Sequence, residues 1–399
     1  MKKTPLALAA ISAIAALTAS TAYAQSTVQM YGKLYPYLLD ERGTGPTAAG
    51  TPVSTLSPTP TGARGIPNQK GMESGNSRLG FRGEEDLGDG FKGLFQIEGV
   101  VGVDSGTSNF ASRDTFVGLE GRFGTVRLGN MDTVFKNYGD TIGFLGLSSG
   151  TFLSSSSVLR KTGFGTSSSS SFHLRRANSF VYETPDIGNV HASVQYSTNE
   201  AKTDTRDPRV ISMGIKYDKG PFYVSLAHEI HYDLFGGSLN APTARRNNAD
   251  QAVNSRDDAT QLALEYRLTK NHRFEFDVIR KNYKENATIN GRFRDYKNTA
   301  YEFIVDNRWS AQWRTAFQFV KAQSGSCSLV NLACSTDGLN GYKVALGASY
   351  SLSKRTLLFA AVNVLKNGKS ARFSNTDLGL GPNIGEDIQQ AAVGISHSF

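Results

Sequence analysis

Two short stretches of this 399-residue sequence match motifs that carry chemistry in enzymes. Residues 146–150 read GLSSG, the G-x-S-x-G pattern of serine hydrolases, which works only on a sharp turn between a strand and a helix. This copy lies in a loop rich in Ser and Gly. Residues 228–231 read HEIH, which lacks the i, i+4 spacing of a helical zinc site, and in a strand these two histidines point to opposite faces. We therefore expect no catalytic residue, no metal site, no cofactor and no enzymatic activity.

Charged side chains follow a more regular pattern. Residues 77–98 read SRLGFRGEEDLGDGFKGLFQIE, in which apolar positions alternate with charged or polar ones. The alternation returns in residues 261–268, QLALEYRL, and in residues 273–278, RFEFDV. Because successive side chains of a strand point to opposite faces, each segment predicts a strand with one apolar and one charged face.

The first 24 residues have the features of a secretory signal. Two lysines precede an apolar stretch, and the segment ends in Ala-Tyr-Ala, a cleavage site of the A-x-A type. We expect residues 1–24 to be removed and residues 25–399 to form one exported domain. After Gln25, no run of roughly 20 apolar residues offers a membrane helix. A helical membrane protein is thus excluded, and a soluble periplasmic protein or an outer-membrane β-barrel remains.

The charge balance excludes one class of partner. The chain has 43 Lys and Arg against 35 Asp and Glu, a formal net charge of +8. These basic residues are scattered and interleaved with acids, whereas a nucleic-acid-binding surface requires a clustered basic patch. We therefore expect no nucleic-acid partner.

Only two cysteines occur, Cys327 and Cys334, within SGSCSLVNLACSTDG. In the oxidising space outside the cytoplasm, such a pair closes a small loop through a disulfide. A metal pair is the alternative, but no His and no other Cys lies nearby in the sequence. We expect the disulfide.

Alternating segments separated by turns recur along the whole mature chain. The turns on one side are short, as in residues 87–90, 121–124 and 185–188, whereas the connections on the other side are long and polar. This asymmetry is typical of a membrane barrel with short periplasmic turns and long outer loops. The sixteen predicted strands are residues 27–39, 77–86, 91–101, 111–119, 125–131, 178–184, 189–197, 208–218, 221–232, 258–268, 272–283, 297–308, 311–322, 341–351, 356–366 and 388–399.

A soluble β-sandwich also alternates, but it buries one face of each sheet against the other. With apolar side chains facing lipid and Arg, Glu, Asp and Gln facing a water-filled interior, no charge loses its solvation. A closed cylinder also satisfies every backbone amide without leaving an edge. Sixteen strands are enough to enclose an aqueous channel. The alternating last strand ends at Phe399, which looks like the assembly signal of bacterial outer-membrane barrels.

Several stretches resemble the trimeric general porin family of Gram-negative outer membranes. The resemblance implies an all-β fold, a 16-stranded antiparallel transmembrane β-barrel with a long, inward-folded third loop. It also implies a homotrimer in the bacterial outer membrane, in contact with lipid and lipopolysaccharide, that passes small hydrophilic solutes and inorganic ions. The matching stretches are VQMYGKLYPYL at 28–38, residues 77–98, SRDTFVGLEGRFGTVRLGN at 112–130, NSFVYETPDIGNVHASVQYS at 178–197, YSLSKRT at 350–356 and VGISHSF at the end.

The family narrows its channel with basic side chains on the wall and acids on the third loop, here residues 132–177. The resemblance implies that Lys33, Arg78 and Arg113 are the basic residues of the wall. Arg82 and Arg127 also occupy inward-facing positions of their strands. On the loop, Asp140 matches the position of an acid, and Lys136 and Arg160 add positive charge.

The family's second loop acid is absent, because residues 142–146 read IGFLG. Fewer acids facing more bases favour anions. We therefore expect a general diffusion pore with weak to moderate anion selectivity. The alternative is a solute-specific porin that binds a small anionic metabolite, and an enzyme or adhesin built on a barrel is the third class.

Overall fold

A computed structural model describes residues 27–165, 167–198, 200–248 and 252–399. The predicted signal segment, residues 1–24, lies outside the described residues. The strands are β1 (Thr27–Leu34), β2 (Tyr37–Thr44), β3 (Gln69–Glu73), β4 (Arg78–Gly88), β5 (Phe91–Val101), β6 (Ser108–Asn109), β7 (Thr115–Gly121), β8 (Gly124–Asp132), β9 (Arg175–Glu183), β10 (Val190–Thr198), β11 (Arg209–Lys219), β12 (Phe222–Tyr232), β13 (Arg256–Thr269), β14 (His272–Lys284), β15 (Phe293–Arg308), β16 (Trp313–Ala322), β17 (Ser326–Leu329), β18 (Gly341–Ser351), β19 (Thr356–Asn367) and β20 (Asp387–Ser398).

Helical turns are few and short. They are α2 (Val134–Gly139), η1 (Phe144–Gly146), α3 (Ser156–Leu159), η2 (Ser168–Ser170), η3 (Ser238–Asn240) and η4 (Thr243–Arg245). Among the residues that the structure describes, no helix has both the length and the apolar character needed to cross a membrane.

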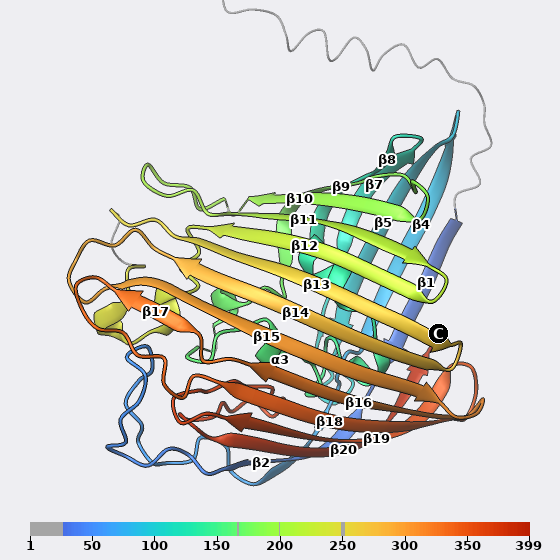
Figure 1. Cartoon of the computed structure of the whole chain (residues 1–399). Helices are drawn as coiled ribbons and strands as arrows, with labels where there is room; N and C mark the ends of the chain where they lie inside the picture. The colour runs from blue at the N-terminus through green and yellow to red at the C-terminus, as the bar shows by residue number, and fades with distance from the viewer. Residues whose placement is uncertain (1–26, 166, 199, 249–251) are drawn as a thin grey trace, which may run out of the picture.

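The strands form one closed antiparallel sheet with sixteen passes, as predicted (Figure 1). β1 and β2 together make the first pass and β3 and β4 the second, whereas β6 and β17 are short additions that pair with β5 and β15. Long connections gather at one end of the barrel, and short turns lie at the other end together with the C-terminus. The first pass is interrupted at Pro36, a residue that has no N–H to give to a sheet.

The last strand closes the barrel against the first. Lys33 and Leu34 pair with Ser398 and His397, and the backbone N–H of Phe399 donates to the carbonyl of Gly32 at 3.1 Å. A Cβ at Gly32 would lie 2.4 Å from the Phe399 ring, so the aromatic side chain needs a glycine opposite it. Phe399 thus seals the seam between the two ends of the sheet. Its role as an assembly signal stays a prediction.

The outer face carries the apolar half of each alternation. Outward side chains such as Leu226, Leu262, Phe276 and Val393 are 39–56% exposed. Together they form an apolar belt around the barrel, and so large an apolar surface marks a contact with lipid or protein.

The interior holds the buried core. Phe135, Phe164 and Phe172, from the connection between β8 and β9, have no exposed surface and pack in one cluster with Tyr283 and Tyr296 of the wall. The core therefore lies between this connection and the inner face of the barrel.

The remaining sequence motifs have simple structural roles. Cys327 and Cys334 form a disulfide across 5.7 Å between their Cα atoms, which confirms the pairing. The hydroxyl of Ser148 donates to the carbonyl of Ile142 at 2.7 Å, within a turn of the loop. His228 is bonded to Thr260 on the exposed outer face, while His231 is buried and bonded to Glu229 at 2.8 Å, so the two rings face opposite ways as expected.

Candidate pore constriction

The connection between β8 and β9, residues 133–174, is the third long loop and is here called the third loop. Its helix α2 packs against β10, β11, β12 and β13, and α3 packs against β15, β16 and β18. Figure 1 shows α3 and the neighbouring segments enclosed by the strands. The third loop therefore lies along the inner face of one side of the barrel, which we call the covered wall, β10 to β20.

Polar side chains of the covered wall hold the backbone of the third loop. The carbonyl of Gln195 accepts from Val134 N at 3.0 Å, and Tyr223 donates to the Tyr138 carbonyl at 2.7 Å. Further along, the amide of Gln318 donates to the Leu147 carbonyl at 2.8 Å. Buried backbone groups must be paired, and these side chains supply the partners that a loop inside a barrel lacks.

Two lysines extend this support. The ammonium of Lys281 donates to the carbonyls of Leu159 and Lys161, both at 2.7 Å, and Lys343 donates to the carbonyl of Ser154 at 2.8 Å. Both lysine side chains are fully buried. Charge-assisted bonds of this kind are stronger than neutral ones, so the two lysines fix the middle of the third loop.

The opposite side of the interior, on β1, β4, β5, β7, β8 and β9, is here called the open wall. Glu98 of β5 lies at its centre with a side chain only 9% exposed. It forms ion pairs with Arg78 at 3.3 Å and with Arg113, and it accepts from the Tyr31 hydroxyl at 3.0 Å. The structure thus brings Arg78 and Arg113 together around one shared carboxylate.

The other predicted wall residues lie on the same face. Arg127 pairs with Glu183 of β9 at 2.8 Å. Lys33, the register partner of Arg78, lies 4.2 Å from the centre of the Tyr35 ring. Arg82 lies over the Tyr31 ring at 5.0 Å and donates to the Gln29 side chain at 3.0 Å. In the described part of the chain, neither Lys33 nor Arg82 has a carboxylate within 4.0 Å.

The predicted loop charges are arranged differently. Asp140 forms an ion pair with Arg160 and bonds His173 Nε2 at 3.1 Å. Arg160 has no exposed side-chain surface, and its Nε donates to the Gln261 side chain at 3.1 Å. The neighbouring cations hold the pKa of Asp140 well below its usual range, and burial lowers the pKa of His173 to about 4 despite Asp140. Asp140 and Arg160 therefore neutralise each other between the loop and the covered wall.

Lys136, the third predicted loop residue, forms an ion pair with Asp132 at 2.9 Å, and its side chain is 11% exposed. Asp132 also forms an ion pair with Arg175 at 2.7 Å. Lys136 therefore lies at the start of the third loop, where the loop leaves the open wall.

Two further inward cations, Arg175 and Arg273, lie on the two walls. Arg175 joins Asp114 and Asp132 on the open wall, each at 2.7 Å. Across the interior, Arg273 pairs with Glu265 at 2.8 Å and donates to the Thr141 carbonyl at 3.2 Å, at the edge of the third loop. In the alternating segment RFEFDV, Arg273 occupies the charged, inward-facing side, and this pattern could have identified it.

Comparisons with known proteins agree with the barrel fold. The family model described as Gram-negative porin matches residues 7–370. The major outer membrane protein P.IB of Neisseria meningitidis serogroup B is 25% identical over 326 residues, covering 80% of this chain and 86% of that protein. The homologue of Neisseria lactamica is 24% identical over 328 residues, covering 81% and 83%.

Solved porin structures share the fold. An anion-selective porin from Comamonas acidovorans has a TM-score of 0.69 at 22% identity, with 94% of this chain and 100% of that chain covered. The trimer form of OmpT from Vibrio cholerae has a TM-score of 0.62 at 14% identity, with 94% and 99% covered. The chain belongs to the Gram-negative porin family, whose members are channels rather than enzymes, and the protein is located in the bacterial outer membrane.

Proposed function

We propose that this porin is a passive diffusion channel for small hydrophilic solutes and inorganic ions, and that it favours anions. The observation that supports this proposal is the positive charge of the open wall. Its five predicted cations have only two carboxylates within 4.0 Å among the described residues, Glu98 and Glu183. An excess of fixed positive charge beside a narrow aqueous path raises the local concentration of anions.

The third loop narrows this path, and the negative charge that it carries is neutralised. Its acid, Asp140, is neutralised by Arg160, and its backbone is held by the covered wall. Passing ions therefore meet the cations Lys33, Arg78, Arg82, Arg113 and Arg127 of the open wall, which we assign to the constriction. Lys136, Asp140 and Arg160 keep the third loop in place beside them.

The test is electrical. The purified protein is inserted into a planar bilayer, and the zero-current potential is measured across a tenfold gradient of potassium chloride. An ohmic conductance with a potential of the sign set by chloride permeation supports the proposal. A silent bilayer would reject the pore, and a potential of the opposite sign would reject the selectivity.

A solute-specific porin is the second candidate. A cavity of about 320 Å³ beside the open wall is lined by Arg82, Arg127, Phe116 and Gln96, among others. Two cations beside an aromatic ring suit a small organic anion. Saturable block of the ion current by one such anion would favour this candidate, whereas solute flux that rises linearly with concentration would favour general diffusion.

We also propose that the protein is a homotrimer in contact with outer-membrane lipid and lipopolysaccharide. The trimer form of OmpT, which has a similar fold, and the outer surface of this barrel support the proposal. The outer face of β2, β3 and β18 to β20 is hollowed, with a cavity of about 740 Å³ lined by small residues such as Gly71, Ala348, Ala360 and Ala391. Small side chains let another barrel approach closely. Heat-sensitive migration as a trimer in a detergent gel tests this, and a single monomer band in mild detergent would contradict it. We also propose that residues 1–24 are removed on export, which the mass of the mature protein tests.

A further inference from the structure

The outer face of β11 to β15 changes character along the strands. One register row that crosses these strands is entirely apolar or aromatic, namely Ile215, Leu226, Leu262, Val278 and Tyr301. Towards the long loops, the outward positions of β14 become Arg280, Asn282 and Lys284 in place of Val278. A strand rises roughly 3.3 Å per residue, so Arg280 to Lys284 cover roughly 13 Å of the strand beyond the apolar belt. This is the level at which lipid headgroups meet a membrane protein.

Cations concentrate in this outward band. Arg209, Tyr232 and Arg256 are successive register partners on β11, β12 and β13. The neighbouring pairs Ser255 with Glu285 and Asp258 with Asn282 place Lys284 beside Arg256 on the next strand. The outward cations of the band, here called the rim cluster, are Arg209, Arg256, Arg280, Lys284 and Lys297.

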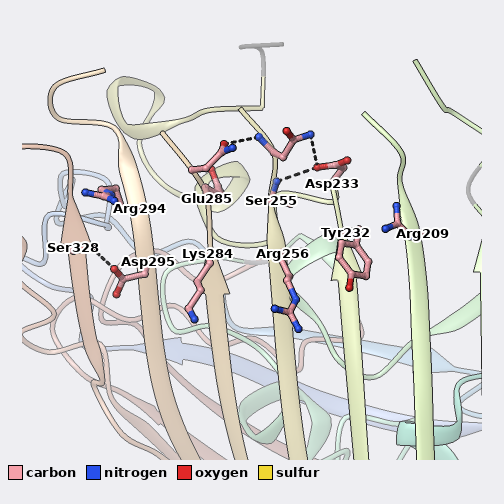
Figure 2. A pocket seen from close by; sticks show the side chains of 12 residues that line it. Arg209, Tyr232, Asp233, Ser255, Arg256, Lys284, Glu285, Arg294, Asp295 and Ser328 are labelled. Atoms are coloured by element: carbon pink, nitrogen blue, oxygen red, sulfur yellow. Dashed lines mark hydrogen bonds between the residues drawn. The ribbon is translucent and has the colours of Figure 1, made fainter. Parts of the chain in front are cut away.

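Arg209, Arg256 and Lys284 of the rim cluster border a shallow cavity of about 690 Å³ (Figure 2). The side chains of Arg256 and Lys284 run along their strands, away from the long loops and towards the apolar belt. In the described part of the chain, Arg256, Arg280, Lys284 and Lys297 have no carboxylate within 4.0 Å. Arg209 pairs with Asp207 at 2.9 Å and lies over the Tyr232 ring at 4.0 Å.

The carboxylates around the cavity are occupied elsewhere. Glu285 accepts from Ser238 N at 2.8 Å and from the Asn247 amide at 2.7 Å, both in the loop after β12. Asp233 accepts from Ser255 N at 3.0 Å and from Asp207 N at 2.8 Å. Asp295 accepts from Ser328. Glu285 and Asp233 are thus engaged by the loops, and Arg256, Arg280, Lys284 and Lys297 are left for an external partner.

We propose that the rim cluster binds the phosphate groups of a glycolipid of the outer leaflet, of the lipid A type. The proposal rests on the proposed function, because it requires that the long loops face outwards. Arg256 and Lys284 are on adjacent strands about 4.8 Å apart, close enough to contact one phosphate together. Arg280 precedes Lys284 by four residues on β14, and it therefore lies nearer the apolar belt, where the acyl chains begin. A free phosphate ion would need no such position beside an apolar surface.

The test compares lipid binding by purified, full-length variants in detergent. In the rim variant, Arg256, Arg280 and Lys284 are each replaced by Gln. In the control variant, the same substitution is made at Lys219, Lys354 and Arg355, three exposed cations of the short turns. The probes are bis-phosphorylated lipid A, its dephosphorylated form, and inorganic phosphate as a competitor, and binding is measured by native mass spectrometry.

The rim variant is expected to bind bis-phosphorylated lipid A about a hundredfold more weakly than the wild type, at about 1 kcal/mol for each cation. The control variant is expected to bind like the wild type, and dephosphorylated lipid A is expected to bind weakly to all three. The proposal would be overturned if the rim variant bound bis-phosphorylated lipid A as tightly as the wild type does. It would also be overturned if the wild type bound the phosphorylated and dephosphorylated forms equally. Release of lipid by millimolar phosphate would instead identify a site for the free ion.

A planar bilayer recording separates this inference from the proposed function. The three substituted side chains lie on the outer face, so the rim variant is expected to keep the wild-type conductance and ion selectivity. Lost lipid binding with a normal channel supports the rim cluster, whereas normal lipid binding in a protein that conducts no current would reject only the proposed function.

Discussion

The unpaired cations of the open wall provide the sharpest test of how this porin selects ions. Lys33 and Arg82 have no carboxylate within 4.0 Å in the described part of the chain, so replacing both with Gln removes two charges without leaving an acid unpaired. Lys33 lies over Tyr35, and Arg82 lies over Tyr31. A Gln at either position can still lie against these rings. The substitutions should therefore change the field in the pore and leave the fold intact.

The size of the effect follows from Coulomb's law. An ion that passes about 6 Å from a unit charge interacts with it by about 0.7 kcal/mol in water, and by about 0.4 kcal/mol after screening at 0.1 M salt. This energy raises the local anion concentration about twofold and lowers the local cation concentration about twofold. Each lost cation should lower the anion-to-cation permeability ratio about fourfold, and the double variant about fifteenfold.

The assay is the zero-current potential in a potassium chloride gradient, recorded for the wild type, each single variant and the double variant. Arg280→Gln is the matched control, because this side chain is exposed on the outer face and its loss should leave the ratio unchanged. The potential of the double variant should fall towards zero in 0.1 M salt and differ less from the wild type in 1 M salt, where screening is stronger. If the double variant keeps the wild-type anion-to-cation permeability ratio at low salt, the assignment of selectivity to the open wall is refuted.

Three further predictions concern other parts of the constriction. Glu98→Gln frees its two arginine partners and should raise the anion-to-cation permeability ratio about fourfold in the same recording; a fall would contradict it. Lys281→Met with Lys343→Met removes three buried bonds to the third loop, each worth about 1.5–3 kcal/mol. Single-channel conductance and proteolysis of the third loop should both increase, and an unchanged channel would show that these lysines do not hold the loop. The pKa of His173 is lowered to about 4 by burial, so its stabilising contribution is complete above the unfolded value of about 6.5 and is lost as the pH falls towards 4. The free energy of unfolding should drop by up to about 3 kcal/mol over this range, and His173→Gln, the control, should lack that component.

The alternation of residue types was sufficient to predict the barrel. All sixteen predicted passes are present, and the apolar face of each pass points outwards, as Leu262 and Phe276 illustrate. A one-residue error in register would exchange the two faces, so the pattern determines the orientation of each strand strongly. The interruption at Pro36 is a local exception, because residues 27–39 were predicted as one strand.

The sites of individual charges were harder to predict. Asp140 and Arg160 were both expected to face the pore, but they bind each other, 20 positions apart in the sequence. Glu98 belongs to β5, whereas Arg113 lies in the connection just before β7, so their contact depends on the path of that connection. The odd or even position of a charged residue in a strand shows which face of the strand it occupies. It does not show how a long loop within the barrel will pair the charges that it covers.

The two walls of the barrel explain how a loop narrows the channel without closing it. A loop inside a barrel must find partners for its backbone groups, and the covered wall offers amides and lysines such as Gln195, Gln318 and Lys343. On the open wall, the guanidinium groups of Arg78, Arg113 and Arg127 are instead paired with the carboxylates Glu98 and Glu183. Docking there would also desolvate Arg78 and Arg113 against one carboxylate, at a cost of several kcal/mol per unpaired ion. The third loop is therefore stable against one side only, and the ionic path remains beside the cations of the other.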